Sequence, residues 1–551
     1  MEGPSTSDER GPVRPALVAA AIGAVVWPVV PFTVALQTPS YAVSVDALLL
    51  LLFAVLVPRA RGVALGAYAL LLGWEVIRST GAVLMDQDPL LYDLIYLLRH
   101  FAVLGQDLLG WLLAPVVLGV VLVLVLGVVF GGWLLDRGRH GPRSEWVGIA
   151  AGIGLIVWAA DGPARFSSVA LGRNLVESVA VRGDVDDLVK APPYDPFDGL
   201  SLASRPDLHV YVVESYGRIL HKRKSVRSTW EDRTYHRDKR LQAAGYETVS
   251  AFVTAPVSGG RSWLADATLL TGRRIAHESV FRQVMARVDG MVHLPGILGD
   301  AGYDTILVRP KDRARPGVSL RNDLAFRTTV FFDELAYPGA PVGWGWIPDQ
   351  YTLGWLAEER LSAPDGPPRF VFAHLVSSHA PWHVVPPVAK DWRDAGEGVD
   401  PAEQVPHEAD RRGALDELWL QLGRYQRREG HRGKRKAAAS HVQRYADAVD
   451  YDLEVLTDHL LALPDRPAVV VLLGDHQPPL VARSDDFDVP VHVLSRDPAL
   501  LASLRDHGFQ QGWALSPDAR PVGRMEGLMT LFLHQLAAPD GLDLPVWMDG
   551  L

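Results

Sequence analysis

Hydrophobic residues are concentrated in the first third of the chain. Two long uncharged runs cover residues 15–45 and 108–135, and three shorter apolar runs cover residues 47–58, 62–77 and 146–160. A helix needs about 20 apolar residues to cross a bilayer core, so the short runs require tilt or a thinner bilayer. One short run alone is often a buried core helix, but five runs within residues 1–161 predict an α-helical transmembrane domain of about five spans.

The loops between these runs predict an orientation. Basic residues precede the first span and lie in two of the loops, at Arg10, Arg14, Arg59, Arg61, Arg137, Arg139 and Arg143. Residues 81–109 instead contain four aspartates and one arginine. The positive-inside rule then predicts a multi-pass protein of the cell membrane, with everything after residue 161 extracytoplasmic. We expect the charged apolar stretch 89–105 to lie on the outer face as an interfacial helix; a sixth span there would place the large domain inside the cell.

The pattern changes at residue 207. Apolar runs of strand length recur at residues 208–213, 248–253, 305–308, 370–376, 468–473 and 489–494. Helical patterns lie between them, at residues 351–361 and 442–461. Strands that are hydrophobic throughout are typical of sheets covered on both faces, so we predict an α/β domain with a mostly parallel sheet at residues 207–551.

Two polar segments border or interrupt this domain. Residues 162–206 are expected to form a linker with some helical content. Residues 385–440 are expected to form a polar insertion, with a basic cluster within residues 411–436. For that cluster, a solvated loop is favoured over a contact with an anionic lipid or polymer.

Composition and charge exclude several classes of protein. The chain has 551 residues, a formal net charge of −10 and no cysteine. Without cysteine there are no disulfides, cysteine nucleophiles, cysteine-based zinc sites or iron–sulfur clusters. The net negative charge argues against a nucleic-acid partner, because phosphate neutralisation needs a basic surface.

Polar residues follow three of the predicted strands. Glu214 follows the first, His379 lies in the loop after residues 370–376, and Asp475 and His476 follow residues 468–473. Ligands of open parallel sheets bind at the carboxyl ends of strands, and carboxylates with imidazoles suit a divalent metal such as Zn or Mn. Singly, Glu214 is more often a cap or ion-pair residue and His379 a structural loop residue. Their joint occurrence favours a metal site.

Ser262 is a candidate nucleophile. It stands where a glycine-rich turn, residues 258–261, enters a helical pattern that Gly272 closes. A helix start supplies positive dipole and free backbone donors, which suits attack on an anionic ester. A serine at such a place is also commonly an N-cap, and this stretch alone leaves both readings open.

Four short motifs occur along the chain in an order that is typical of one superfamily. They read Glu-Ser-Tyr-Gly at 214–217, Gly-Arg-Ser at 260–262 with Thr-Gly at 271–272, Ser-Ser-His-Ala-Pro-Trp at 377–382, and Gly-Asp-His-Gln at 474–477. Over residues 207–522 the chain resembles the alkaline phosphatase/sulfatase superfamily. The five predicted spans resemble its membrane-bound, sulfatase-like branch of lipoteichoic acid synthases and phosphoethanolamine transferases.

The resemblance implies roles for individual residues. Glu214, Ser262, Asp475 and His476 match the ligands of one divalent metal ion (Mn, Zn or Mg). Ser262 also matches the nucleophile, and His379 matches the histidine that steadies the substrate phosphate. Trp344 and Asp349 lie where some relatives contact the head group.

Two departures from the family pattern refine the expected activity. Membrane-bound transferases usually carry threonine where this chain has Ser262, and serine serves the same chemistry. Formylglycine sulfatases need a Cys/Ser-x-Pro-x-Arg run, whereas residues 262–266 lack both the proline and the arginine. A true sulfatase is therefore not expected.

The resemblance thus implies a metal-dependent extracytoplasmic transferase. It would move a phosphoryl head group onto a cell-envelope lipid or glycan through a covalent Ser262 intermediate. The alternatives are a phosphodiesterase or sulfuric ester hydrolase of the same superfamily, and a catalytically silent membrane scaffold. The complete set of ligand and nucleophile residues argues against the scaffold.

Overall fold

The computed structural model describes scattered residues between 50 and 94 and most of the chain from 167 onward. The later residues are 167–190, 197, 200, 202–312, 324–342, 346–380, 382, 384–399, 434–479 and 486–537. The chain divides into two compact units, Met1–Arg182 and Gly183–Leu551.

Little of the predicted transmembrane domain falls within these residues. The runs 15–45, 108–135 and 146–160 lie outside them, and the runs 47–58 and 62–77 are described only in part. Within the described residues, no helix combines the length and the apolar character needed to cross a bilayer.

One local arrangement is described in the first unit. Residues 91–94 form a helical turn, and the first part of α8 (Ser167–Lys190) supplies polar partners for the start of that turn. Asn174 accepts a hydrogen bond from Leu91 N through Oδ1 and donates one to Pro89 O, both at 2.9 Å. Ser178 Oγ accepts a bond from Tyr92 N at 3.2 Å. Amides that lack partners at a helix start are thus satisfied by side chains one turn apart on α8. The rest of the predicted interfacial helix, from residue 95, lies outside the described residues.

The second unit is built on one sheet, which has nine strands in the described part of the chain. The strands are β1 (Asp207–Val213), β2 (Glu247–Thr254), β3 (Asp304–Val308), β4 (Thr328–Val330), β5 (Arg369–Leu375), β6 (Ala468–Gly474), β7 (Asp488–Ser495), β8 (Gln510–Gln511) and β9 (Gly523–Arg524). Their order across the sheet is β4-β3-β5-β1-β6-β7-β2-β8, and β9 also pairs with β2.

The sheet is mixed, so the prediction of a mostly parallel sheet is wrong. Strands β4, β3, β5, β1 and β6 are parallel neighbours, but β7 runs antiparallel to both β6 and β2, and β8 runs antiparallel to β2. Residues 489–495 of β7 are buried, as in the parallel strands. A continuous apolar run reports burial on both faces and carries no information about strand direction.

The predicted positions of the main strands are confirmed. All six apolar runs fall within one residue of β1, β2, β3, β5, β6 and β7. The sequence analysis missed β4, β8 and β9, which have two or three residues each and no apolar run long enough to predict a strand.

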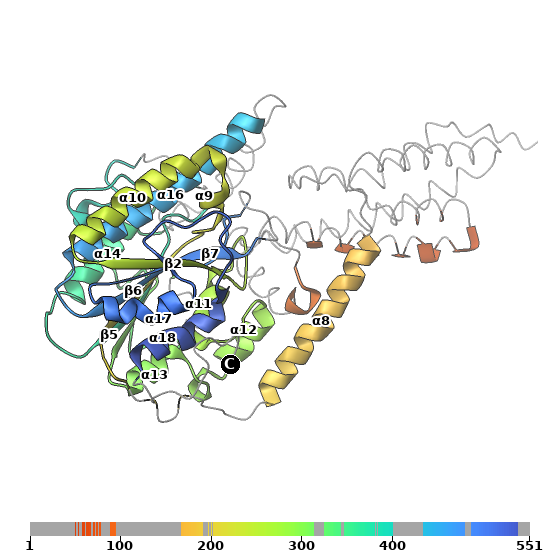
Figure 1. Ribbon diagram of the computed structural model, residues 1–551. Coiled ribbons are helices and arrows are strands. Elements are labelled where there is room, and N and C mark those ends of the chain that lie inside the picture. Colours follow the sequence, from red (N-terminus) through yellow and green to blue (C-terminus); the bar gives the residue numbers. More distant parts are fainter. Residues whose placement is uncertain are drawn as a thin grey trace, which may run out of the picture. The chain divides into compact units, whose positions relative to one another are not determined.

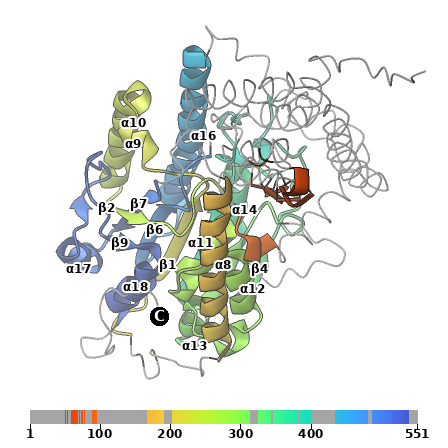
Figure 2. The same cartoon turned by 90° about the vertical axis from the view of Figure 1, so that its right-hand side faces the viewer.

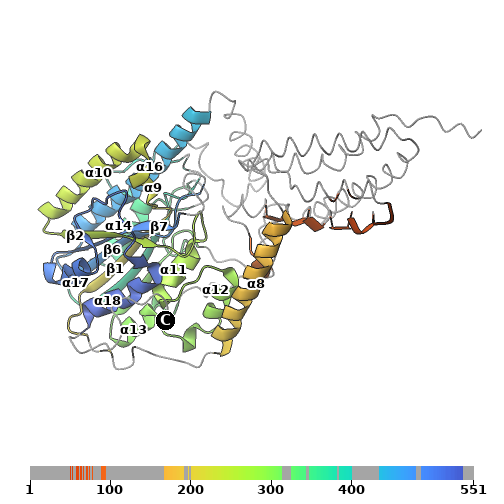
Figure 3. The same cartoon turned by 45° about the vertical axis from the view of Figure 1, so that its right-hand side comes forward.

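Helices cover both faces of the sheet (Figures 1 and 3). One layer comprises α9 (Ile219–Lys222), α10 (Lys224–Ala243), α14 (Asp349–Glu359) and α16 (Lys434–Ala462). The other comprises α11 (Ser262–Thr271), α12 (Glu278–Met285), α13 (Leu294–Asp300), α17 (Ala502–Asp506) and α18 (Leu528–Leu536). Figure 2 shows α10 and α16 side by side, and their side chains form ion pairs with one another.

Short 3-10 helices complete the described elements, and α16 occupies the end of the predicted insertion. The 3-10 helices are η1 (Pro58–Ala60), η3 (Val288–Gly290), η4 (Trp392–Asp394), η7 (Pro498–Leu501) and η8 (Met525–Gly527). Of the predicted polar insertion, residues 434–440 form the start of α16 and residues 400–433 lie outside the described part.

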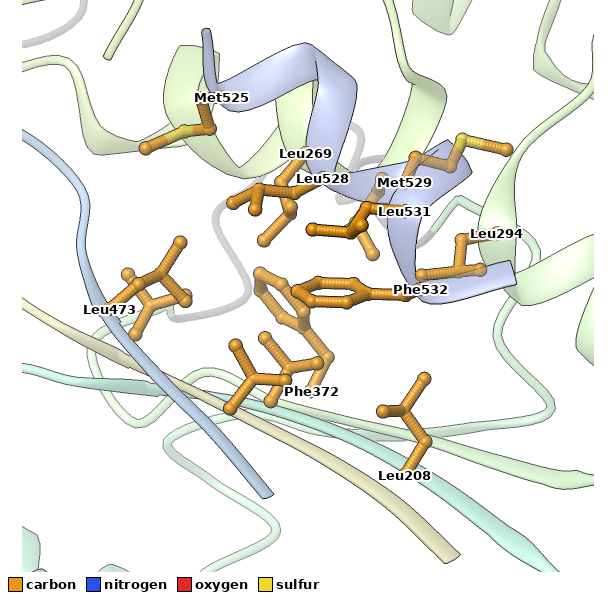
Figure 4. Packing of buried hydrophobic residues seen from close by; sticks show 14 of the residues in the cluster. Leu208, Leu269, Leu294, Phe372, Leu473, Met525, Leu528, Met529, Leu531 and Phe532 are labelled. Atoms are coloured by element: carbon orange, nitrogen blue, oxygen red, sulfur yellow. The ribbon is translucent and has the colours of Figure 1, made fainter. Parts of the chain in front are cut away.

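Alternation along β1 divides the core between the two layers. Leu208, Val210 and Val212 belong to the cluster under α11 and α18, whereas Tyr211 and Val213 belong to the cluster under α10 and α16. In the first cluster, α18 packs onto the sheet through Phe532, with Leu208, Phe372 and Leu473 on the strands below it (Figure 4). Burying each such side chain contributes roughly 1.5–3 kcal/mol, so the two clusters hold the central strands in register.

Candidate active site

The carboxyl ends of β5, β1 and β6 meet at one edge because these three strands are parallel neighbours. Register pairs Val212 with His374 and Val213 with Gly474, so the residues that follow β1 and β6 start level with each other. Glu214, His374, Asp475 and His476 are all buried, with at most 2% of each exposed. The structure thus brings together the predicted Glu214, Asp475 and His476.

Helix α11 brings Ser262 to the same edge. Ser262 is the first residue of α11, and the cap position before it is Arg261 in the left-handed conformation. The Ser262 hydroxyl donates to Glu214 Oε2 at 2.9 Å and lies 3.3 Å from His476 Nε2. The hydroxyl is therefore directed into the acidic cluster, and its helix presents a positive N-terminal dipole to the same place.

Glu214, His374 and Asp475 form a group with metal-binding geometry. One ligand atom from each lies within 4.8 Å of the other two. His374 Nε2 is 3.5 Å from Glu214 Oε2 and 3.6 Å from Asp475 Oδ2. Both His374 Nε2 and Asp475 Oδ2 are buried without a hydrogen-bond partner. Such orphaned atoms are costly unless a cation satisfies them, so these residues fit a divalent metal ion.

His374 is a ligand candidate that the sequence analysis missed. Its Nδ1 lies 3.1 Å from each carboxylate oxygen of Asp266, and Arg309 Nη2 in turn lies 3.0 Å from Asp266 Oδ2. A carboxylate on the far nitrogen is the usual support for a metal-binding histidine, since it fixes the tautomer and ring orientation. His374 lies inside the apolar run of β5, where nothing in the pattern distinguishes a ligand from a core residue.

The remaining histidine and carboxylate are oriented by the loop after β6. Asp475 Oδ1 accepts hydrogen bonds from Ser215 N and His476 N, both at 2.7 Å, which directs Oδ2 into the cluster. His476 Nδ1 donates to Gln477 O at 2.9 Å, so its Nε2 faces Glu214 and Asp475 at 3.3 Å each. His476 and Ser262 can therefore join the three-residue group as further ligands.

Cations surround the Glu214 carboxylate. Lys311, which follows β3, places Nζ 3.1 Å from Glu214 Oε2. Burial alone would raise the pKa of Glu214, but Lys311 and His374 lower that pKa well below its ordinary value. Burial opposes the charged form of His374 as well, yet the negative charge of Asp266 raises its pKa to about 9. The sequence analysis missed Lys311, because a lysine after a strand end gives no signal of its own.

His379 lies half-buried beside this cluster. Its Nδ1 donates to Ala380 O at 2.6 Å, so the lone pair of the neutral ring is on Nε2. Burial lowers the pKa of His379, against the opposing charge of Glu214. The Trp346 ring lies 6.1 Å from the His379 ring.

Of the two residues predicted to contact a head group, the structure describes only Asp349. Trp344 lies outside the described residues. Asp349 is fully buried as the first residue of α14. Its carboxylate accepts hydrogen bonds from Val376 N at 2.7 Å and Ser377 N at 2.6 Å, so it holds the backbone of the loop that carries His379.

The backbone around the site is strained and tightly packed. Ser215, Arg261 and Trp382 are non-glycine residues with positive φ (59°, 66° and 56°), and all three lie in loops of the site. Such conformations concentrate at functional sites, where the surroundings enforce them. At Gly474, the last residue of β6, an added Cβ would overlap the backbone oxygen of Tyr216, so the two backbones approach closely there.

Comparison with known proteins gives structural similarities at low sequence identity. The lipoteichoic acid synthase LtaP from Listeria monocytogenes matches with a TM-score of 0.37 and 14% identity, over 67% of this chain and 80% of that chain. The integral membrane lipooligosaccharide phosphoethanolamine transferase A from Neisseria meningitidis matches with a TM-score of 0.43 and 14% identity, over 88% and 85%. A protein in the alkaline phosphatase superfamily from Vibrio parahaemolyticus matches with a TM-score of 0.36 and 15% identity, over 66% and 80%. No family model and no curated protein matches the sequence.

Proposed function

We propose that the chain is a metal-dependent phosphoryl-head-group transferase of the alkaline phosphatase/sulfatase type. It acts at the outer face of the cell membrane, on an envelope lipid or glycan, through a covalent Ser262 intermediate. The observation that carries the proposal is the Ser262 hydroxyl, 2.9 Å from Glu214 in a buried group of carboxylates and imidazoles. Two ligand atoms of that group are orphaned and directed at each other.

The metal would be held by Glu214, His374 and Asp475, with His476 and Ser262 within reach. When bound, a divalent ion supplies positive charge that lowers the pKa of a coordinated hydroxyl and stabilises negative charge on a phosphoryl group. Carboxylate, imidazole and hydroxyl donors suit Zn, Mn or Mg without choosing among them.

The chain's own residues account for the proton and bond changes of a double displacement. The Ser262 hydroxyl would lose its proton to water before the attack, since Glu214 is held ionised and does not keep that proton. The Ser262 oxygen bonds to phosphorus while the bond from phosphorus to the leaving oxygen breaks, and the protonated form of His379 gives its Nε2 proton to that oxygen. In the second half, His379 takes a proton from the accepting hydroxyl, whose oxygen bonds to phosphorus. The Ser262 oxygen departs and regains its proton.

Lys311 fits this reaction as the cation that meets the substrate's negative charge. Its ammonium group contacts Glu214, and its side chain is about one-third exposed (32%). The Lys311 ammonium group, which contacts Glu214, would also form an ion pair with the phosphate of a phosphodiester bound beside Ser262. The five predicted spans would keep the enzyme at the membrane that contains such a lipid.

Trapping the phospho-enzyme tests the proposal. The full chain, loaded with metal, would be incubated with vesicles that contain phosphatidylethanolamine or phosphatidylglycerol labelled with ³²P, quenched in acid and mapped by mass spectrometry. We expect a head-group phosphate adduct on Ser262. Ser262→Ala should lose the adduct and turnover while it retains the metal, whereas Ser258→Ala, in the same turn, should keep all three.

Two outcomes would overturn the proposal. Turnover by Ser262→Ala would remove the nucleophile assignment. Release of inorganic sulfate from a sulfate ester, with no adduct from either lipid, would instead favour the sulfuric ester hydrolase.

A further inference from the structure

Two buried carboxyl groups lie in contact behind the loop that carries His379. Asp349 opens α14 and Asp452 lies in the middle of α16, and neither side chain is exposed to solvent. The two carboxyl groups act on each other electrostatically, and the Oδ1 oxygen of each is buried with no hydrogen-bond partner. Among the described residues, no lysine, arginine or histidine forms an ion pair with either carboxyl group.

The pair binds the backbone of three consecutive residues. Asp349 Oδ2 accepts from Val376 N and Ser377 N at 2.7 and 2.6 Å, and Asp452 Oδ2 accepts from Ser378 N at 3.0 Å. In return, Asp349 N donates to Ser377 Oγ at 3.0 Å. The amides therefore all point at the carboxyl pair, which fixes the path of the chain between β5 and His379.

One of the two groups must carry a proton. Each group has one oxygen, Oδ1, that is buried with no hydrogen-bond partner. An ionised carboxylate only accepts hydrogen bonds, so two ionised groups in contact would repel each other. Burial and the charge of Asp349 raise the pKa of Asp452 well above its ordinary value. The pair then holds one proton and one negative charge, which faces three amide dipoles.

The other titratable groups around the pair stay neutral. Tyr451 of α16 lies within its field, and burial raises the pKa of Tyr451 well above its ordinary value. Tyr337 is an electrostatic neighbour of Tyr451, and burial raises the pKa of Tyr337 to about 12.

The loop held in this way is connected to the site at two further points. Ser378 Oγ donates to the backbone oxygen of Glu214 at 2.6 Å, and Trp382 Nε1 donates to Ser378 O at 2.6 Å. His379 N donates to Val376 O at 3.0 Å, which closes the turn. A shift of these residues would move His379 relative to Ser262 and the metal ligands.

We propose that Asp349 and Asp452 act as a proton-sharing pair of positioning residues, which sets the place of the His379 imidazole for phosphoryl transfer. The inference rests on the proposed function for what His379 does. It goes beyond that function because it gives two residues that do not touch the substrate a role in positioning His379.

Two substitutions at one position separate positioning from simple stability. In Asp452→Asn, the amide group donates to Asp349 Oδ1 and its oxygen still accepts from Ser378 N, so we expect kcat within about twofold of the natural chain. Asp452→Leu loses both bonds, and we expect kcat to fall by about 10²-fold with KM and metal content unchanged, as for a catalytic group displaced by about 1 Å. Both variants would be assayed as the full chain with metal bound.

Two measurements check the pair without using activity. Hydrogen–deuterium exchange at the amides of residues 376–378 should be accelerated in Asp452→Leu and unchanged in Asp452→Asn. Infrared spectra should show a buried protonated carboxyl band that is absent from Asp452→Asn. Asp450→Leu is the matched control on the same helix, because it removes an ion pair with Arg237 and should leave exchange at residues 376–378 as it was.

Opposite results would overturn the inference. Natural kcat and exchange in Asp452→Leu would show that the pair positions nothing. An equal loss of kcat in Asp452→Asn and Asp452→Leu would show that the proton itself is needed, and absence of the infrared band would remove the shared proton. If Ser262→Ala shows that the proposed transferase reaction is wrong, the exchange and infrared results still decide whether the pair holds the loop.

Discussion

Two buried carboxyl pairs lie close to each other in this molecule and have different partners. Glu214 and Asp475 face Lys311, His374 and His476, and these cations keep Glu214 ionised despite its burial, whereas burial and the charge of Glu214 raise the pKa of Asp475. Asp349 and Asp452 face backbone amides and each other, and burial raises the pKa of both. We propose that the first pair holds a metal ion and that the second shares a proton. The difference teaches that burial alone does not decide the charge of a carboxyl group; the partners within hydrogen-bonding distance do.

The largest effect is expected at the first pair. Asp475→Asn replaces an orphaned carboxylate oxygen with a neutral amide and should leave the full chain with little bound metal. Turnover should fall on the order of 10³-fold, the scale of losing a group that stabilises transition-state charge. Elemental analysis of the purified protein and a head-group transfer assay would measure both. Asp349→Asn serves as the control from the second pair, and it should retain the metal; equal metal loss in both would contradict the comparison.

A smaller effect is expected from the support of His374. Asp266→Asn weakens the hydrogen bond to His374 Nδ1 and removes a negative charge, so metal affinity should fall by about 10–100-fold. Competition with a chelator of known affinity would measure the change. Asp289→Asn, an exposed aspartate, is the matched control. Unchanged affinity in Asp266→Asn would mean that His374 is not a ligand.

The smallest effect concerns the pH dependence of stability at the second pair. The folded-state pKa of Asp452 is raised above its ordinary 3.8, so the folded chain binds more protons than the unfolded chain above about pH 4. Stability contributed by the shared proton is therefore present at low pH and is lost as pH rises, by at most about 1.4 kcal/mol per pH unit. Urea midpoints of the metal-free full chain between pH 5 and 8 should fall less in Asp452→Asn than in the natural chain. Identical slopes would indicate that the pair holds no extra proton.

Much of the fold follows from the sequence because burial leaves a direct trace in residue type. The strands β1, β2, β3, β5, β6 and β7 were predictable from apolar runs, since each is covered on both faces. The direction of β7 was not, because an antiparallel strand in the interior of a sheet has the same apolar content as a parallel one. Strand pairing is a property of distant segments, and no local pattern records it.

The candidate site divides in the same way. Glu214, Ser262, Asp475 and His476 were predictable because they are polar residues at the ends of apolar or glycine-rich segments. His374 was not, since it lies within β5, and its meaning depends on register with β1 and on Asp266 from another helix. Asp349 is the opposite case, because the sequence predicted a substrate contact for this polar residue. The structure shows that Asp349 is fully buried and that its carboxylate accepts hydrogen bonds from backbone amides.

The close backbone contact between Gly474 and Tyr216 affects the distance between the loops that carry Glu214 and Asp475. Because an added Cβ at 474 would overlap the Tyr216 oxygen, any larger residue would act as a wedge between the loops after β1 and β6. Those loops carry Glu214 and Asp475, so the wedge would widen the opening between the two carboxylates. The distance between these two carboxylates therefore depends in part on a residue that has no side chain.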